Sequence, residues 1–194
     1  MAGTRAEQRE ATRRALLAEG RRRFAADGFH EVVLADVASA IGATKGAAYH
    51  HFGSKLGLFR AVAAELQEEL GERVAREADE HTDPWDRLRA GSRAFLAAGT
   101  DLAVRRILLV DAPTVLGWEE WRRMDEDASA RHLAEALQDL ADARLIAPQP
   151  VEPLARLLSG AMNEAALWLA GSDDPAALEA TAAALDALLD GLRT

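Results

Sequence analysis

The sequence predicts an all-helical protein that begins with a small helix-turn-helix domain. Alanine is abundant whereas Val, Ile, Thr and aromatic residues are sparse, and this composition favours helix over strand. Apolar residues recur with helical spacing along most of the 194-residue chain. A pair of short helical segments meets at Gly42, as expected where two helices cross in a helix-turn-helix.

The composition excludes several classes of protein. The chain has no cysteine, which rules out disulfides, thiolate metal sites and cysteine nucleophiles. Its N-terminus is polar and charged, unlike a signal peptide, and no window approaches the roughly 18 apolar residues of a membrane span. We therefore expect a cytoplasmic protein that does not contact a membrane.

The net charge of −9 is distributed unevenly along the chain. Residues 1–55 hold nine Lys/Arg and six acidic residues, a net charge of +3, whereas the remainder carries −12. A basic head on an acidic body directs the head toward phosphate. Alone, this asymmetry does not identify a nucleic-acid partner, because many proteins have lopsided charge.

The N-terminal elements follow from their apolar faces and from the residues that end them. An amphipathic helix over 6–27 carries Phe24 on its apolar face, and Gly28 ends it because glycine tolerates the left-handed conformation. Two short helices over 34–40 and 44–50 follow. Together they predict a compact three-helix head.

The two short helices have the features of a helix-turn-helix. Val37 and Ile41 share the inward face of the first helix, and Gly42 supplies the sharp turn that a residue with a Cβ would resist. Thr44 can cap the second helix, which leaves its first N–H groups facing outward. That end, with Lys45 beside it, suits a phosphate or a base edge in the major groove.

Six further helices and no strand are expected in the rest of the chain, which makes about nine helices in total. Ser54 caps the first of these six, and Asp83 with Pro84 begins the second. The six ranges are 55–80, 84–98, 101–111, 118–143, 152–170 and 175–192, and a loop over 171–174 separates the last two.

Residues 9–59 resemble the N-terminal domain of the TetR family of repressors. The most specific match is Tyr49-His50-His51-Phe52, which Ser54-Lys55 follows. Further matching pieces are Gly28-Phe29, Ala35-Asp36-Val37-Ala38, the run from Ile41 to Gly46, and Leu58-Phe59. The rest of the chain matches the family in length and helix count.

The resemblance implies DNA-binding roles for residues of this segment. It places the start of the recognition helix against base edges, the residues after it against phosphates or nearby bases, and Lys55 on a phosphate. We also consider that Arg5 and Arg9 form a flexible arm that reaches the DNA. The residues expected to bind DNA are Ala35, Thr44, Lys45, Gly46, Ala47, Tyr49, His50, His51 and Lys55.

The segment departs from the usual pattern at four positions. Val33 stands where Ser or Thr commonly caps the second helix, and Ala35 where some members carry a base-reading side chain. Ala48 replaces a larger aliphatic residue, and Leu56 replaces a common Glu. With Lys45 alone offering a long side chain to the groove floor, we expect specificity to depend on DNA shape, backbone contacts and the tyrosine.

The resemblance also divides the chain into a DNA-binding domain over 1–55 and an effector-binding and dimerisation domain over 56–194. TetR-like proteins bind a small inducer between the helices of the second domain. Ordinary core packing is the alternative role for each of the tryptophans there. The residues expected at such a pocket are Phe95, Leu108, Asp111, Trp118, Trp121, Met124, His132, Met162 and Asn163.

The last two helices are more apolar than the surface of a monomer needs. They form either the core of the second domain or, in addition, a dimer interface, and the resemblance predicts a four-helix bundle across a twofold axis. The interface residues expected on this basis are Leu154, Leu158, Ala161, Leu178, Leu185 and Leu189.

The function expected is that of a homodimeric repressor, which a small-molecule inducer of unknown identity releases from palindromic double-stranded DNA. The alternative is a ligand-independent DNA-binding protein with a purely structural C-terminal domain. No nucleophile–base set, phosphate loop or metal-ligand spacing suggests an enzyme or a cofactor. His50-His51 is a poor metal site, because neighbouring side chains on a helix diverge and no carboxylate cluster accompanies them.

Overall fold

The computed structural model describes residues 4–172 and 174–194, and its regular elements are ten α-helices and one π-helical segment. The expected loop over 171–174 includes residue 173, which lies outside the described residues. The bounds are α1 Arg5–Glu31, α2 Leu34–Ala40, α3 Lys45–Phe52, α4 Lys55–Asp79, α5 Pro84–Ala98, η1 Val104–Asp111, α6 Ala112–Val115, α7 Trp118–Glu126, α8 Ser129–Asp142, α9 Val151–Ala170 and α10 Ala177–Asp190.

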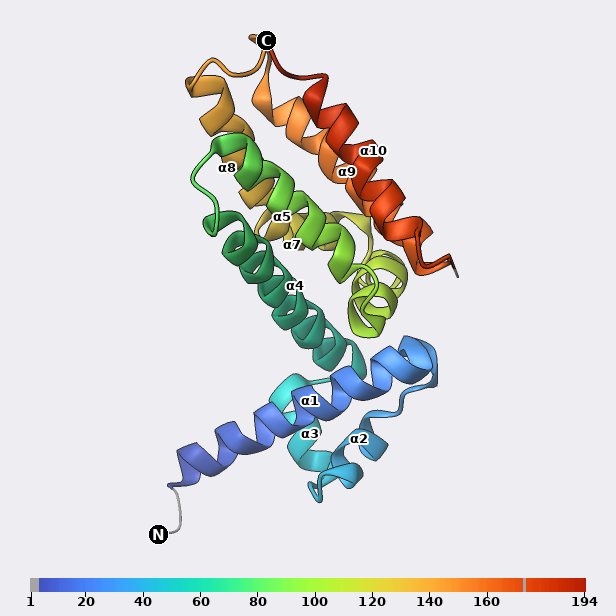
Figure 1. The fold of residues 1–194 in the computed structure, drawn as a ribbon. Helices are drawn as coiled ribbons and strands as arrows, with labels where there is room; N and C mark the ends of the chain where they lie inside the picture. Colours follow the sequence, from blue (N-terminus) through green and yellow to red (C-terminus); the bar gives the residue numbers. More distant parts are fainter. Residues whose placement is uncertain (1–3, 173) are drawn as a thin grey trace.

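The helices form a small head joined to a larger body, and this confirms the expected all-helical fold (Figure 1). In the head, α1 lies across the lower end of α4, with α2 and α3 beneath it. In the body, α5 packs along α4, and α9 and α10 run side by side along one flank. The boundary expected at residue 55 coincides with the start of α4, so one continuous helix links the head to the body. No helix in the described part of the chain is long and apolar enough to cross a membrane.

The head is organised around three phenylalanines from α1 and α4. Phe24 and Phe29 each meet the ring of Phe59 edge-on, with ring centroids 5.1 Å apart in both pairs. Edge-to-face packing of buried rings adds to the free energy gained by burying them. The same apolar core continues along α4 into the body, so the head is not packed separately.

The first helix starts earlier and extends further than the apolar pattern predicts. Thr4 caps it, and Glu7 completes a capping box by accepting from the Thr4 N–H. Arg5 and Arg9 therefore lie on a helix, and the flexible arm considered for them is wrong. Gly28 (φ 79°) interrupts the helix near its end, and the Phe29 N–H donates instead to Asp111 Oδ2 at 2.8 Å.

One long helix expected over 118–143 is two helices, α7 and α8. The backbone leaves the helical region at Ala128 (φ −122°, ψ −106°). Neither glycine nor proline marks the break, which explains why the sequence pattern did not predict it. Asp125 and Ser129 flank the break, and the Ser129 hydroxyl donates to the Asp125 carboxylate at 2.8 Å inside the protein.

The segment expected as a helix over 101–111 is helical, but it is a π-helix that continues into α6 through Pro113. The Ala112 N–H donates to the Ile107 carbonyl, five residues back. Pro113 has no N–H to donate to the next carbonyl, that of Leu108. The indole Nε1 of Trp121 donates to this carbonyl at 2.8 Å, which ties α7 to η1.

Candidate nucleic-acid interface

The turn between α2 and α3 brings the two helices together at a sharp angle. Val37 and Ala38 are fully buried on the inner face of α2. Gly42 adopts φ 71°, which favours glycine, and the Ala43 N–H closes the turn by donating to the Ala38 carbonyl at 2.9 Å. The turn therefore fixes the direction in which α3 leaves α2.

The first turn of α3 faces away from the protein. Thr44 caps this helix by accepting from the Ala47 N–H at 3.1 Å. Lys45, Gly46 and Tyr49 are exposed, and the Lys45 ammonium lies 5.6 Å from the centroid of the Tyr49 ring. Since the N–H groups at a helix start lack helical partners, this end of α3 presents donors and positive charge to the exterior.

The opposite face of α3 packs against the rest of the head. Ala48 is fully buried there, where the family pattern more often has a larger side chain. Ala47 is half-buried between this face and the exposed one. A small residue at position 48 lets α3 sit close to the neighbouring helices.

The two histidines in the last turn of α3 differ in environment. His50 is exposed, whereas His51 is half-buried, and their ring centroids lie 5.8 Å apart. Burial lowers the pKa of His51, and the positive charges of Arg9, His50 and Arg13 lower this pKa further. Within the described ranges, no group of three or more potential ligands is arranged to hold a metal ion.

The remaining expected DNA-binding residues lie at the starts of α2 and α4. Val33 provides no side-chain cap for α2, and Ala35 is half-buried in the first turn of that helix. The Lys55 ammonium donates to the carbonyls of Phe29 and His30 at 2.8 and 3.0 Å. It has three donors, so one is left for a phosphate while the other two hold the end of α1.

A small cavity lies in the body between α4, α5, α8 and α9. Its volume is about 40 Å³, and its lining includes Phe95, His132 and Met162 from the expected set. A second space of about 10 Å³ shares Phe95 and Met162 and extends to Asp125 and Ser159. An apolar wall that meets a few polar groups is typical of a small-molecule site.

The polar groups at the end of this cavity form a buried network, of which only Asn163 was expected from the sequence. Asp125 is 2% exposed, and its carboxylate accepts from Arg122 at 3.0 Å and from the Ser159 hydroxyl at 3.2 Å. The amides of Gln67 and Asn163 approach the same carboxylate at 3.5 Å. A signal was present, since Trp121, Asp125 and Ser129 have the four-residue spacing of one helix face.

Several residues expected at the pocket do not line either space. Asp111 accepts from the Phe29 N–H at the junction with the head, and Asn163 belongs to the Asp125 network. Trp121 is buried with its indole on the Leu108 carbonyl, while Trp118 is 64% exposed and packs against Trp121. Met124 is half-buried on α7.

The residues expected at a dimer interface divide into two groups. Leu158, Leu185 and Leu189 are buried within the protomer, whereas Leu154 and Leu178 are half-buried and Ala161 is exposed. The large apolar residues that face outward on α9 and α10 were not chosen from the sequence. They are Leu157, Leu167, Trp168 and Leu188.

An N-terminal helix-turn-helix on a helical body defines the class of helix-turn-helix transcriptional regulators. Residues 16–62 match the family model described as bacterial regulatory proteins, tetR family. Residues 85–192 match the model described as tetracyclin repressor-like, C-terminal domain. The chain belongs to the TetR family of transcriptional regulators.

Individual relatives agree with this assignment. A solved TetR-family regulator from Pectobacterium atrosepticum is 36% identical, with 99% of this chain and 98% of that chain covered at a TM-score of 0.79. The repressor Rv1474c of Mycobacterium tuberculosis is 33% identical over 57% of this chain and 58% of its own length. The regulator BetI of Stenotrophomonas maltophilia is 41% identical over 32% of this chain and 33% of its own length. The chain thus aligns with less than two thirds of these two curated relatives.

Proposed function

We propose that this chain represses transcription as a homodimer that binds a palindromic operator and is released by a small-molecule effector. The observation that carries DNA binding is the outward face of α3, where Lys45, Gly46 and Tyr49 are exposed beside the Thr44 cap. The N–H groups and positive charge at this end suit phosphates and base edges in the major groove.

The proposed dimer forms through the outward faces of α9 and α10. These faces expose Leu157, Trp168 and Leu188, and apolar groups clustered on a surface mark interaction sites. A twofold axis between the pairs of helices makes the contact self-complementary. The two copies of α3 then reach successive major grooves, roughly 34 Å apart, on a palindromic site.

The proposed effector binds in the cavity lined by Phe95, His132 and Met162, with the Asp125 network at one end. Because the cavity has a volume of only about 40 Å³, the effector must bind a conformation in which the surrounding helices have moved apart. An effector that prefers this conformation shifts the population away from the form that binds DNA.

One observation favours the ligand-independent alternative. The cavity volume of about 40 Å³ is far below the several hundred Å³ typical of small-molecule sites. The two candidates are separated by screening small molecules for a rise in melting temperature and for release of DNA. A compound that does both supports the effector-controlled repressor, whereas a screen without any such compound favours a structural C-terminal domain.

The DNA-binding proposal is tested by selecting bound sequences from a pool of random duplexes. We expect a palindromic consensus, because two α3 helices related by a twofold axis read the same sequence on opposite strands. The matched control is a Lys45→Ala, Tyr49→Phe variant, which removes one charge and one hydroxyl from the outward face. The proposal is supported if the wild type enriches a consensus sequence and the variant does not, while the two proteins have the same melting temperature. It is contradicted if the wild type enriches no sequence.

A further inference from the structure

An open trough lies between the start of α1 and the end of α3. Its volume is about 570 Å³, and it is lined by Arg5, Arg9 and Arg13 of α1 and by His51 of α3, together with Ala6 and Glu10. The three arginines follow one another at four-residue intervals, which places them on one face of the helix. Since Thr4 and Glu7 form a capping box at the start of α1, this row of arginines is held on a regular element.

The arginines of the trough are free to bind an anion. Among the described residues, Arg5, Arg9 and Arg13 form no ion pair, and Glu10 is the one acidic residue in the lining. Arg13 is steadied by the ring of Phe52, whose centroid lies 5.8 Å from the guanidinium carbon.

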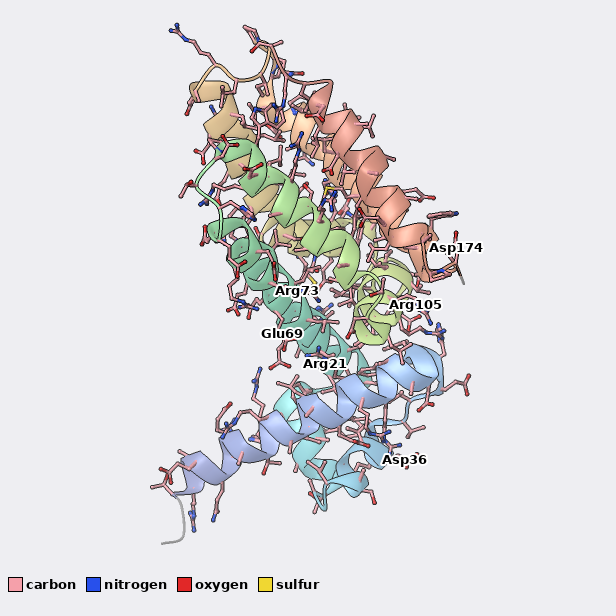
Figure 2. All side chains as sticks on the ribbon, in the orientation of Figure 1. Arg21, Asp36, Glu69, Arg73, Arg105 and Asp174 are labelled. Atoms are coloured by element: carbon pink, nitrogen blue, oxygen red, sulfur yellow. The ribbon has the colours of Figure 1, made fainter. Side chains whose placement is uncertain are left out.

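The arginines further along α1 have a different environment. Arg21 pairs with Glu69 of α4 at 2.6 Å (Figure 2), and Arg22 and Arg23 share Glu19. Each of these three guanidinium groups is thus paired with a carboxylate of the protein. Among the described residues, four arginines of α1 form no ion pair, Arg5, Arg9, Arg13 and Arg14, and the first three of them line the trough.

The position of the trough connects it to the proposed DNA-binding surface. His51 lies in the last turn of α3, two residues after the exposed Tyr49. An anion held between Arg9, Arg13 and His51 therefore lies directly beside the helix that enters the major groove. Guanidinium groups bind phosphate oxygens through charge-assisted, often bidentate hydrogen bonds.

We propose that this trough seats a phosphate of the operator backbone beside the groove that α3 enters, which makes α1 a second DNA-binding element. The proposal rests on the proposed DNA-binding function. The trough adds affinity and fixes the position of the head on the duplex, and it does not read sequence, because phosphate contacts carry no base information. An inorganic phosphate ion offers the same chemistry, so the test must distinguish the two sources.

The main test is the salt dependence of operator binding by an Arg9→Ala, Arg13→Ala variant. Each phosphate contact that is lost lowers the slope of log K against log salt concentration by about 1. We expect at least a roughly tenfold weaker affinity at low salt, a smaller slope and an unchanged preference for the operator over a mutated site.

The matched control is an Arg76→Ala, Arg123→Ala variant, which loses the same charge from exposed positions on α4 and α7. We expect this variant to bind like the wild type. If the wild type binds its operator and both variants bind equally well with equal slopes, the trough is not a DNA contact and the inference is overturned. If the wild type itself binds no DNA, the proposed function fails first.

Two further measurements identify the source of the phosphate. Methylphosphonate groups, which remove the charge of single operator phosphates, are placed along the duplex one at a time. At one backbone position we expect the substitution to weaken the wild type and to leave the Arg9→Ala, Arg13→Ala variant unaffected. Inorganic phosphate is also titrated while the chemical shift of His51 is followed by NMR. If this shift reaches its limit at phosphate concentrations that leave operator binding unchanged, the trough is a free-anion site and the proposal is overturned.

Discussion

At the scale of single residues, Asp111 joins the body to the head. It ends the π-helical segment, and its carboxylate accepts from the Phe29 N–H, which Gly28 has released from the helix. The Arg106 guanidinium lies against Gly28, where a Cβ would meet it at 2.2 Å, and also approaches Asp111 at 3.5 Å. Asp111 and Arg106 therefore connect η1 to the end of α1.

Replacing this carboxylate is expected to destabilise the protein. Asp111→Ala leaves the Phe29 N–H without its partner at a partly buried position, which costs about 1–3 kcal/mol of unfolding free energy. Asp111→Asn keeps one acceptor oxygen and serves as the matched control, with a smaller loss. Urea unfolding of the three proteins measures both effects, and equal midpoints would show that the contact contributes nothing.

Glu19 gives the stability of the head a dependence on pH. Hydrogen bonds from Arg22 and then from Arg23 lower the pKa of Glu19 from 4.5 to about 2. Because the pKa in the folded state is depressed, the stabilisation is complete above pH 4.5 and is lost as the pH falls through about 2.

The prediction concerns the urea midpoint between about pH 5.5 and about pH 3. We expect the wild-type midpoint to fall further than that of Glu19→Gln over this range, since the glutamine does not titrate. The two arginines stay charged throughout and need no separate control. Parallel curves for the two proteins would contradict the assigned role of the ion pairs.

At the scale of elements, α9 and α10 carry two different apolar faces. Leu158, Leu185 and Leu189 point into the protomer, whereas Leu157 and Leu188 are 73% and 61% exposed. Burial inside a protomer and burial between protomers leave the same apolar spacing in a sequence. For that reason the sequence predicted an apolar pair of helices without revealing which leucines face outward.

The outward face supplies a test of the proposed dimer. A Leu157→Asp, Leu188→Asp variant places charges on the exposed face, and we expect monomers that keep the helical content and melting behaviour of a folded protomer. Leu185→Asp is the contrasting variant and is expected to unfold the protomer, because it buries an unpaired charge. Light scattering with circular dichroism checks both, and a persisting dimer of the first variant would place the interface elsewhere.

Two departures from the predicted elements lie beside polar contacts between different helices. They are the break at Ala128 and the π-helical form of η1. Trp121 bonds the Leu108 carbonyl, and the Asp125 network includes Gln67 and Ser159. Apolar spacing and local caps predicted most helix ends to within a few residues, but they contain no information on such long-range polar contacts.

At the scale of the whole molecule, the charge and the shape agree with each other. The head carries a net charge of +3 and the body −12, and the head bears both the exposed start of α3 and the arginine-lined trough. The sequence predicted the turn, the cap and the exposed start of α3, because each depends on local residues. It did not predict the trough, which requires two helices to be brought together in space.

The most direct test of DNA binding compares the affinity of the wild type for the selected duplex with its affinity for a shuffled duplex, each at two salt concentrations. We expect two protomers per duplex, a preference for the selected sequence at both concentrations, and an affinity that falls steeply as salt is added. Equal affinity for the two duplexes would contradict the claim that this protein is an operator-specific regulator.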